Sequence, residues 1–283
     1  MEKTISEALI TARVLLGQQN IDSAFIDADL LLTHALNIRR IDLIIHRDRR
    51  LTDEEMDAFS DLIERRISHE PVAYITGVKE FFGIPFMVNP HVLIPRPETE
   101  ILVERSITLA PKGATVFEIG VGCGAVIISI LCERQDLKGV GNDISIPALI
   151  TTRVNAATHG VLDRLRLLAG NVMTGIGGSW PMIIANPPYI RLDEMNSLDD
   201  DVRLYEPAKA LFGGKDGLDI VKEIIKGLSG HLTQGGMLIM EAGRGQKEAI
   251  DSLVGSQKTL KIRSWIHDLA GIERVVIIER IHG

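Results

Sequence analysis

The amino-acid sequence predicts a doubly wound α/β domain preceded by a small bundle of helices. From Ala114 onward, apolar runs typical of buried strands alternate with helical stretches. Their near-continuous hydrophobicity fits a largely parallel sheet covered by helices on both faces. Before residue 68, apolar residues recur instead at helical spacing, as in Ile5, Leu9, Ala12 and Leu16. The expected strands are 115–119, 139–143, 165–168, 182–185, 236–241 and 275–279.

The composition is that of an ordinary globular enzyme. The chain has 283 residues, of which 45% are hydrophobic and 24% charged, and its formal net charge of −7 argues against a dedicated nucleic-acid binder. The first residues lack the pattern of a secretory signal, and apolar runs are shorter than a bilayer span, so we expect a cytoplasmic protein. Cys123 and Cys132 have no Cys-x-x-Cys spacing, and the histidines have no metal-ligand spacing. Neither a disulfide nor a bound metal is therefore expected.

Four short helices are expected between Ile5 and Ile67. Thr52 and Glu55 form a capping box that predicts the start of the last one. Arginines cluster at 39–40, 47–50 and 65–66. We interpret these clusters as solvated helix ends, with a partner-docking face as the alternative.

Residues 74–94 predict a hairpin or an extended connector, because glycines and prolines interrupt runs of Phe, Val and Ile. A helix is expected to follow, with Pro97 in its first turn and Glu98 and Glu100 near its positive dipole end. A catalytic pair formed by these two carboxylates is the alternative interpretation.

A glycine-rich loop joins the first expected strand to its helix, from Glu118 to Ala125. Glycines there let the backbone approach a ligand closely, although a purely structural turn would have the same composition. Asp143 ends the next strand, where a carboxylate can accept hydrogen bonds from both hydroxyls of a ribose. The two features together predict a nucleoside cofactor. They do not distinguish a nicotinamide dinucleotide from S-adenosylmethionine.

Asn186-Pro187-Pro188-Tyr189 follows the apolar run 182–185 and favours S-adenosylmethionine. The prolines end the strand, which places an amide, carbonyls and an aromatic ring at its carboxyl end. The Asn186 side-chain oxygen and the Pro187 carbonyl can accept both hydrogens of a flat –NH2 group, and the tyrosine face can cover its plane. Hydride transfer has no use for such a clamp, whereas methyl transfer to a weakly nucleophilic nitrogen does. A Pro-Pro turn that merely caps a strand is the structural alternative.

Two other stretches are interpreted as structural. Asp199-Asp200-Asp201 is expected to be a solvated loop, with cation binding as the alternative. Residues 213–217 resemble a phosphate loop but lack its spacing, so we expect a turn near the pocket.

With these residues in view, the chain closely resembles the release factor glutamine methyltransferases, which methylate the glutamine of the Gly-Gly-Gln tip of release factors. The resemblance covers nearly the whole length. The Asn-Pro-Pro-Tyr element is shared with adenine-N6 methyltransferases, whereas the stretch from Ile94 to Glu100 joined to a helical domain is more particular. The matching segments are 70–74, Gly77, 93–100, the loop from Gly120, 143–145, 186–190, 206–207, 210–211, Gly214, 216–219 and 273–276.

The resemblance implies a Rossmann-like, seven-stranded methyltransferase domain at 96–283, a β-hairpin linker at 74–95 and a helical substrate-docking domain at 1–73. It implies S-adenosylmethionine as the cofactor and catalytic roles for Asn186, Pro187 and Tyr189. The glutamine amide would be bound by these three residues with Pro188. The implied cofactor-binding residues are Glu118, Gly120, Val121, Gly122, Cys123, Gly124, Asp143, Asn171, Val172 and Asn186.

Two positions depart from the family's pattern. Glu118 stands where the loop often begins with Asp, which should be tolerated. Asn171 stands where an acidic residue often precedes the adenine contact, and an amide mimics only part of a carboxylate's acceptor pattern. The adenine contacts at Asn171 and Val172 are therefore open.

We expect a monomer whose partner is a release factor, with no membrane and no direct nucleic-acid contact. The rival of like chemistry is an adenine-N6 methyltransferase, which needs a basic groove and a base-reading domain that the sequence lacks. A non-catalytic nucleoside sensor and a nicotinamide oxidoreductase are the alternatives from other classes.

Overall fold

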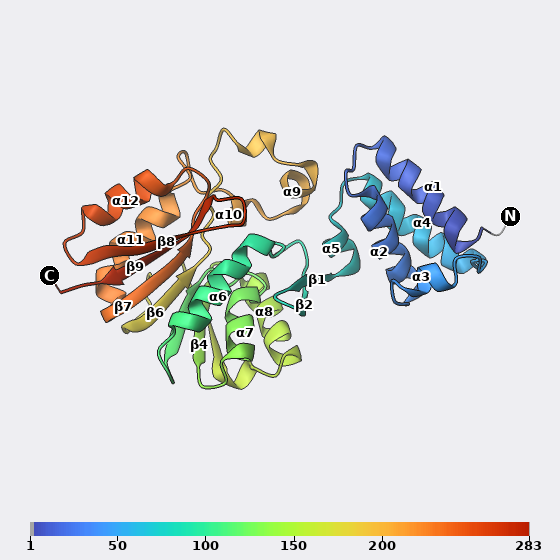
Figure 1. Ribbon diagram of the computed structural model, residues 1–283. Coiled ribbons are helices and arrows are strands. Elements are labelled where there is room, and N and C mark those ends of the chain that lie inside the picture. The colour runs from blue at the N-terminus through green and yellow to red at the C-terminus, as the bar shows by residue number, and fades with distance from the viewer. Residues whose placement is uncertain (1–2, 283) are drawn as a thin grey trace. The chain divides into compact units, whose positions relative to one another are not determined.

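The computed structural model describes residues 3–282, which divide into two compact units (Figure 1). The first unit extends to Val78 and includes a second segment, Asp199–Tyr205. The second unit consists of Lys79–Leu198 and the chain from Glu206 onward.

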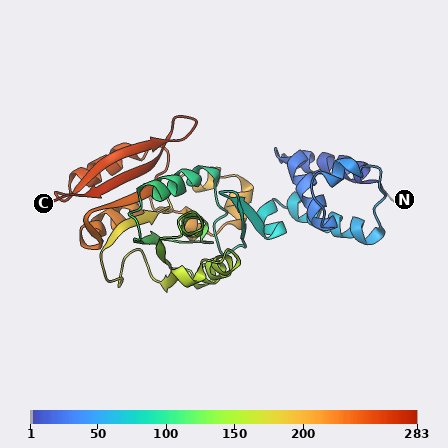
Figure 2. The same cartoon turned by 60° about the horizontal axis from the view of Figure 1, so that its bottom comes forward.

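The first unit is a helical bundle in which α1, α2 and α4 pack against one another (Figure 2). Capping boxes fix two helix starts: Thr4 with Glu7 at α1, and Thr52 with Glu55 at α4. The second box confirms the start predicted from the sequence. Two short helices, α3 and α5, add to those that surround the apolar core. The bounds are α1 Ile5–Gln18, α2 Ala24–Leu36, α3 Asp42–Ile45, α4 Asp53–Ile67, α5 Val72–Thr76 and α9 Asp200–Tyr205.

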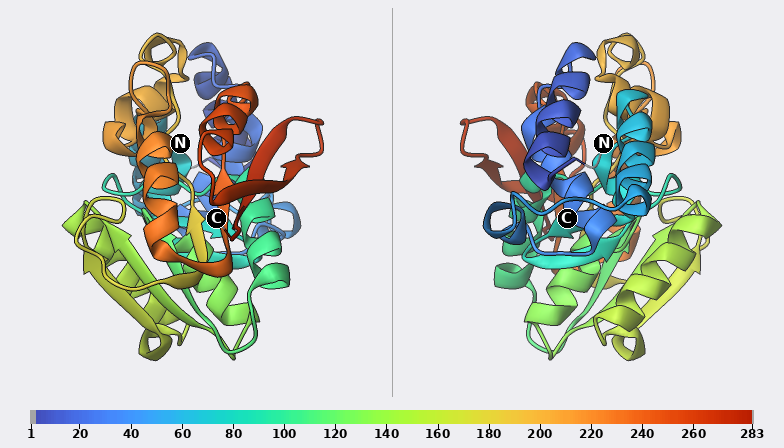
Figure 3. Two further views of the ribbon diagram at one scale, coloured as in Figure 1. Left: turned by 90° about the vertical axis from the view of Figure 1, so that its left-hand side faces the viewer. Right: turned by 90° about the vertical axis from the view of Figure 1, so that its right-hand side faces the viewer.

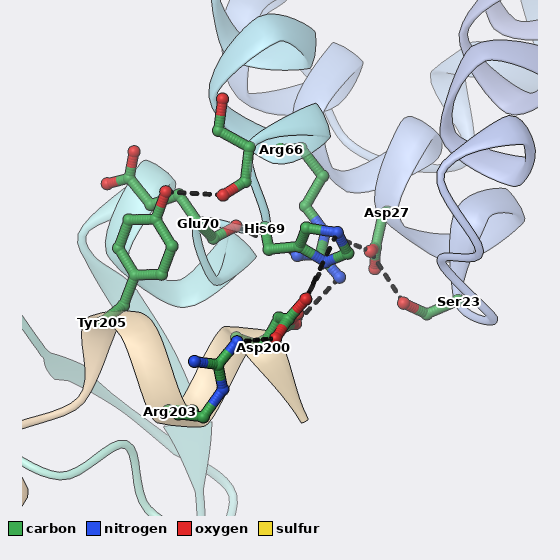
Figure 4. Close-up of polar contacts among 10 residues, drawn as sticks. Ser23, Asp27, Arg66, His69, Glu70, Asp200, Arg203 and Tyr205 are labelled. Carbon is green, nitrogen blue, oxygen red and sulfur yellow. Dashed lines mark hydrogen bonds and ion pairs between the residues drawn. The ribbon is translucent and has the colours of Figure 1, made fainter. Parts of the chain in front are cut away.

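A buried arginine joins α9 to this bundle (Figure 4). The Arg66 side chain is 4% exposed and donates to Asp27 at 2.7 Å and pairs with Asp201 at 2.9 Å. The Tyr205 hydroxyl donates to the Ser68 carbonyl at 2.6 Å. Two expectations are thereby corrected. Arg66 is no solvated helix end, and Asp200 and Asp201 belong to helix α9 rather than to a solvated loop, whereas Asp199 is exposed outside the helix. A buried cation without a partner would strongly destabilise the fold, and Arg66 is paired with the carboxylates of Asp27 and Asp201.

A two-stranded hairpin links the bundle to the rest of the chain in sequence, as predicted. Strands β1 (Val78–Phe81) and β2 (Ile84–Met87) are joined by Phe82 and Gly83, both of which have positive φ. Positive φ at both central residues is the geometry of a tight hairpin turn. The expected connector begins four residues too early, because Tyr74 to Thr76 belong to α5.

The second unit is built on a seven-stranded sheet with the order β5-β4-β3-β6-β7-β9-β8. All neighbouring pairs among β3–β7 are parallel, and β9 runs antiparallel to both β7 and β8. Figure 3 shows β8 and β9 as a hairpin at one edge. Strand β8 was not predicted from the sequence, because its residues are mostly only half-buried and form no continuous apolar run. The bounds are β3 Thr115–Ile119, β4 Lys138–Asp143, β5 Leu165–Ala169, β6 Trp180–Ala185, β7 Leu232–Glu241, β8 Leu260–His267 and β9 Glu273–Arg280.

Both faces of the sheet are buried, as the apolar runs predicted. Phe117, Ile183 and Leu238 pack on one face against α11 and α12, and the alternate residues Val116 and Ile184 are equally buried. Because side chains alternate along a strand, Val116 and Ile184 point to the opposite face of the sheet. Helices α6 and α7, which contact each other, pack on that face. No helix among residues 3–282 is long and apolar enough to cross a membrane. The helix bounds are α6 Glu100–Leu109, α7 Ala125–Glu133, α8 Ile146–Thr158, α10 Ala208–Leu211, α11 Asp219–His231 and α12 Lys247–Gly255, with 3-10 turns η1 Pro97–Thr99, η2 Leu162–Arg164 and η3 Met195–Ser197.

Candidate functional site

A cavity of about 390 Å³ lies in the second unit at the carboxyl ends of β3, β4 and β6. This is the edge at which open α/β sheets bind ligands, and the volume is within the range of small-molecule sites. Of the predicted residues, Gly124 and Tyr189 do not line it. Those that do are Glu118, Gly120, Val121, Gly122, Cys123, Asp143, Asn171, Val172, Asn186, Pro187 and Pro188.

The glycine loop has a backbone that needs glycine. Gly120 and Gly122 have φ of 73° and 56°, and a Cβ at either would meet open space rather than protein. The Gly122 N–H donates to Asp143 Oδ2 at 3.0 Å, and the Ser145 N–H donates to the other carboxylate oxygen at 2.8 Å. Asp143 is thus held in place by backbone groups, with further lone pairs left for a ligand.

Gly124 has a different reason to be glycine. It precedes α7 with a φ of 85°, and a Cβ there would lie 2.7 Å from both Ile128 Cδ1 and Thr152 Cγ2. Its small size therefore allows α7 and α8 to pack closely, and it does not face the cavity.

Two buried polar residues on α8 support the loop and were missed by the sequence reasoning. The Thr152 hydroxyl donates to the Gly122 carbonyl at 2.8 Å, and the Asn155 amide donates to the Cys123 carbonyl at 2.8 Å. Such bonds satisfy loop carbonyls that would otherwise be buried without partners. The signal in the sequence was a pair of polar residues three positions apart on one face of a helix.

Glu118 and Cys123 are both buried beneath the loop. Glu118 accepts a hydrogen bond from the Ile127 N–H at 3.0 Å, and burial raises the pKa of its carboxyl well above the usual value, with Asp143 adding to the effect. Burial likewise raises the pKa of the Cys123 thiol to about 12. The thiol is therefore un-ionised at neutral pH and is no nucleophile.

Asn142 and Val172 shape the far side of the cavity. Val172 has a φ of 47°, which is unusual for a β-branched residue, and its carbonyl accepts a 2.6 Å hydrogen bond from the Asn142 side-chain amide. The same amide donates to the Gly170 carbonyl at 3.2 Å. The Asn142 side-chain oxygen is buried and has no hydrogen-bond partner among residues 3–282. Asn142 therefore acts on the cavity through the Val172 and Gly170 carbonyls that it holds, since its own oxygen is not exposed to the cavity.

The segment Asn186-Pro187-Pro188-Tyr189 begins directly after β6 ends at Ala185. The Asn186 side-chain N–H donates to Thr99 Oγ1 at 3.3 Å, and the Thr99 hydroxyl donates to Glu241 Oε2 at 2.7 Å. Thr99 and Glu241 are both buried. Burial, and then the neighbouring Glu98, raise the pKa of Glu241 to about 7, although the Thr99 hydroxyl opposes the shift.

Residues 213–217 pack against the backbone of this segment, as a predicted turn near the pocket would. A Cβ at Gly213 would lie 2.6 Å from the Pro188 carbonyl oxygen, and one at Gly217 would lie 2.4 Å from the Tyr189 carbonyl oxygen. The Gly213 N–H also donates to the Ile190 carbonyl at 2.9 Å. No side chain fits between the 213–217 turn and the backbone of the Asn186-Pro187-Pro188-Tyr189 segment, so Gly213 and Gly217 set the position of this segment.

Tyr189 lies beside this contact, outside the cavity wall. A Cβ at Gly243 would lie 2.9 Å from its ring. Burial and the nearby Glu241 raise the pKa of the Tyr189 hydroxyl to about 12, so it is not a base at neutral pH. The Gln246 side-chain amide donates to the Gly217 carbonyl at 2.9 Å and thereby holds the 213–217 turn in place.

The cavity rim contains Arg96, from the stretch between Ile94 and Glu100. Arg96 and the Ile94 N–H both bind the carboxylate of Glu206, whose side chain is 1% exposed. Pro97 begins the turn η1 before α6, as predicted. Glu100 accepts a hydrogen bond from the Phe82 N–H at 2.9 Å and does not line the cavity.

Comparison with known proteins places the chain in a family. Residues 7–77 match the PrmC N-terminal domain, and residues 97–204 match the methyltransferase small domain. The chain is 39% identical to the release factor glutamine methyltransferase of Nitratidesulfovibrio vulgaris, over 98% of this chain and 95% of that protein. The chain belongs to the release factor glutamine methyltransferase family. The corresponding protein of Bradyrhizobium diazoefficiens is 37% identical over 97% of this chain and 94% of that one.

Family membership confirms the resemblance found in the sequence and makes the chain a methyltransferase. Solved structures confirm the fold. A methyltransferase from Pyrococcus furiosus superposes with a TM-score of 0.54 at 19% identity, covering 78% of this chain and 98% of that one. The ribosomal protein L11 methylase of Lactobacillus delbrueckii gives a TM-score of 0.51 at 19% identity, over 69% and 84%. The prediction of a Rossmann-like methyltransferase domain is therefore confirmed.

Proposed function

We propose that this protein transfers a methyl group from S-adenosylmethionine to the side-chain amide nitrogen of the glutamine in the Gly-Gly-Gln motif of peptide chain release factors. One observation carries the proposal: Asn186, Pro187 and Pro188 line the same cavity as the glycine loop and Asp143. The residues proposed to bind a planar –NH2 group and those proposed to bind a nucleoside therefore line the same cavity. The names of the relatives supply the release factor.

The residues of the cavity fit S-adenosylmethionine. Open space in front of Gly120 and Gly122 allows a ligand to approach the backbone. Asp143 would bind the ribose hydroxyls, and Asn142 would hold Val172 in place beside the adenine through its hydrogen bond to the Val172 carbonyl. A positively charged ligand beside Glu118 would also favour the ionised form of that buried carboxylate. When bound, the cofactor supplies a methyl group on a positively charged sulfur.

The chain's own contribution is to hold the acceptor nitrogen. An amide nitrogen is a poor nucleophile because its lone pair is delocalised into the carbonyl. Acceptance of its two hydrogens by the Asn186 oxygen and the Pro187 carbonyl would draw the nitrogen toward a tetrahedral geometry and direct the lone pair at the methyl. Proline lacks an N–H and has a fixed φ, so the clamp is rigid before the substrate arrives. Tyr189 does not line the cavity, so its proposed packing on the amide plane requires that the bound glutamine reach beyond the cavity wall.

No base is required before the methyl moves. As the nitrogen–carbon bond forms and the carbon–sulfur bond breaks, the nitrogen becomes positively charged, and its proton then leaves to water. Tyr189, with a pKa of about 12, keeps its own proton at neutral pH. Catalysis would consist of orientation and electrostatic stabilisation, which together contribute several kcal/mol.

The test is incubation of the purified protein with methyl-labelled S-adenosylmethionine and a purified release factor, followed by mass mapping. We expect one methyl group on the glutamine of the Gly-Gly-Gln tip, and none when that glutamine is replaced. The Asn186→Ala variant is the matched control. Label on DNA, or on a protein residue other than glutamine, would overturn the proposal in favour of an adenine-N6 or other methyltransferase.

Residues 1–73 are proposed to help dock the release factor, acting in a cytoplasmic monomer. Exposed apolar side chains in the bundle, among them Phe25, Ile26 and Ile44, offer a surface for it. The Ile44→Ser substitution removes one of these exposed apolar side chains. It should raise KM for the release factor and leave S-adenosylmethionine binding unchanged.

A further inference from the structure

We propose that Thr99 and Glu241 are positioning residues that set which way the Asn186 side-chain amide faces. The inference rests on the proposed function and concerns a step that the clamp itself requires. An asparagine can grip a substrate –NH2 group only if its oxygen, and not its own –NH2, faces the substrate. The two ends of the amide have nearly the same shape, so packing alone selects between them only weakly.

The hydrogen bonds around Asn186 provide the selection. Its N–H donates to Thr99 Oγ1 at 3.3 Å, which leaves the oxygen at the other end of the amide. The Thr99 hydroxyl in turn donates to Glu241 Oε2 at 2.7 Å. Three elements far apart in sequence contribute: η1 before α6, the end of β6 and the end of β7.

The direction of this chain of bonds follows from the charge of Glu241. An ionised carboxylate can only accept hydrogen bonds, so the hydroxyl proton of Thr99 must point toward it. The Thr99 oxygen is then left to accept, and the amide can satisfy it only with its N–H. If Glu241 were protonated or replaced by an amide, it could donate to Thr99, and the hydroxyl proton could turn toward Asn186. The amide could then present either end to the substrate.

Burial makes the arrangement stiff. Thr99 is 4% exposed and Glu241 1%, so both side chains are shielded from bulk solvent. Besides Thr99, the groups that act on the Glu241 carboxyl are Glu98, which disfavours its ionised form, and Arg274 and Tyr189, which favour it. Burial of an ionised carboxylate lowers the stability of the fold, and a role in orienting the Asn186 amide accounts for the presence of Glu241 at this position.

The test compares Thr99→Val, which keeps the shape and removes the hydroxyl, with Thr99→Ser, which keeps the hydroxyl. We expect Thr99→Val to lower kcat for glutamine methylation by about 10- to 100-fold, because a misoriented group near the reacting atoms costs that much. Its KM for S-adenosylmethionine should stay within about twofold. Thr99→Ser should restore most of kcat. The matched control is Ser106→Ala, which removes a buried hydroxyl of α6 that donates to the Leu102 carbonyl one turn earlier in the same helix.

Glu241→Gln provides a second, independent arm. We expect kcat to fall by roughly tenfold, and the decline of wild-type kcat toward acid pH, as Glu241 is protonated, to disappear from the profile. Wild-type kcat in Thr99→Val, or an unchanged acid limb in Glu241→Gln, would overturn the inference. Failure of the proposed function is a separate result, because then the wild-type protein itself would label no release-factor glutamine. Thermal midpoints of all variants separate a loss of folding from a loss of orientation.

Discussion

Replacement of Gly213 by alanine should damage methyl transfer without damage to cofactor binding. The added Cβ would lie 2.6 Å from the Pro188 carbonyl oxygen, 2.7 Å from the Gly217 carbonyl oxygen and 2.8 Å from Tyr189 Cα. All three are backbone atoms, so no side chain can rotate away. Ordinary contact begins at 3.4 Å, which means that the motif must move by about 0.8 Å. A shift of that size in an acceptor clamp lowers a rate by about 100-fold.

The assay is steady-state methylation of a release factor, with S-adenosylmethionine binding measured by calorimetry on the same samples. We expect kcat to fall by about 10- to 100-fold and the cofactor Kd to stay within about threefold, because Gly213 does not line the cavity. Gly230→Ala is the matched control. Gly230 lies on α11 with nothing near its would-be Cβ, so this variant should gain about 0.5–1 kcal/mol of stability and keep full activity. A Gly213→Ala protein with wild-type kcat would refute the reasoning.

Four further outcomes are expected. Asn186→Ala should abolish methyl transfer and leave S-adenosylmethionine affinity within about tenfold, by calorimetry; a larger loss of affinity would contradict the division of roles. Arg66→Met should lower the free energy of unfolding by about 3–5 kcal/mol in urea titrations, because the buried Asp27 loses its cation, and Arg66→Met with Asp27→Leu should recover part of it. Asn142→Ala should weaken S-adenosylmethionine binding by about tenfold, since the Val172 carbonyl loses its hydrogen bond and Val172 is no longer held in place; unchanged affinity would exclude this role. The folded-state pKa of Glu241, about 7, lies above the ordinary glutamate value of 4.5, so its contribution to stability is present below pH 4.5 and lost as pH rises through 7. Glu241→Gln should therefore be more stable than wild type at pH 8, by up to about 3 kcal/mol, and equal results at pH 4 and pH 8 would exclude the linkage.

Most of the strands that were found from the sequence are buried along most of their length. Strand β6 ends in a continuous apolar run, and the apolar residues of β3 are interrupted by Glu118; such strands are typical of the interior of a parallel sheet. The exception is β5, which was predicted although it lies at an edge and is partly exposed. Strand β8 was missed because polar and apolar residues mix along it and form no continuous apolar run. Its pairing with β9 depends on a partner strand and leaves little local signal.

Charged residues were harder to interpret than apolar ones. Arg66 looked like one of several surface arginines, yet it lies buried between Asp27 and Asp201, and the second of these is 135 positions along the chain. Local sequence cannot distinguish a buried ion pair from a solvated one, because the difference lies entirely in the partner. Glu241 had a usable signal, since an acidic residue ends β7 just as Asp143 ends β4.

The sequence by itself determined the fold class, the family and the segment that would face a substrate. Asn186-Pro187-Pro188-Tyr189 after an apolar run must end a strand at its carboxyl edge, because proline cannot continue the ladder and the edge is where parallel strands open to ligands. Only the tertiary structure decided how that segment is held. Thr99, Glu241 and the turn with Gly213 and Gly217 hold it from three places in the chain, and contacts between residues so distant in sequence follow from packing, which no local pattern encodes.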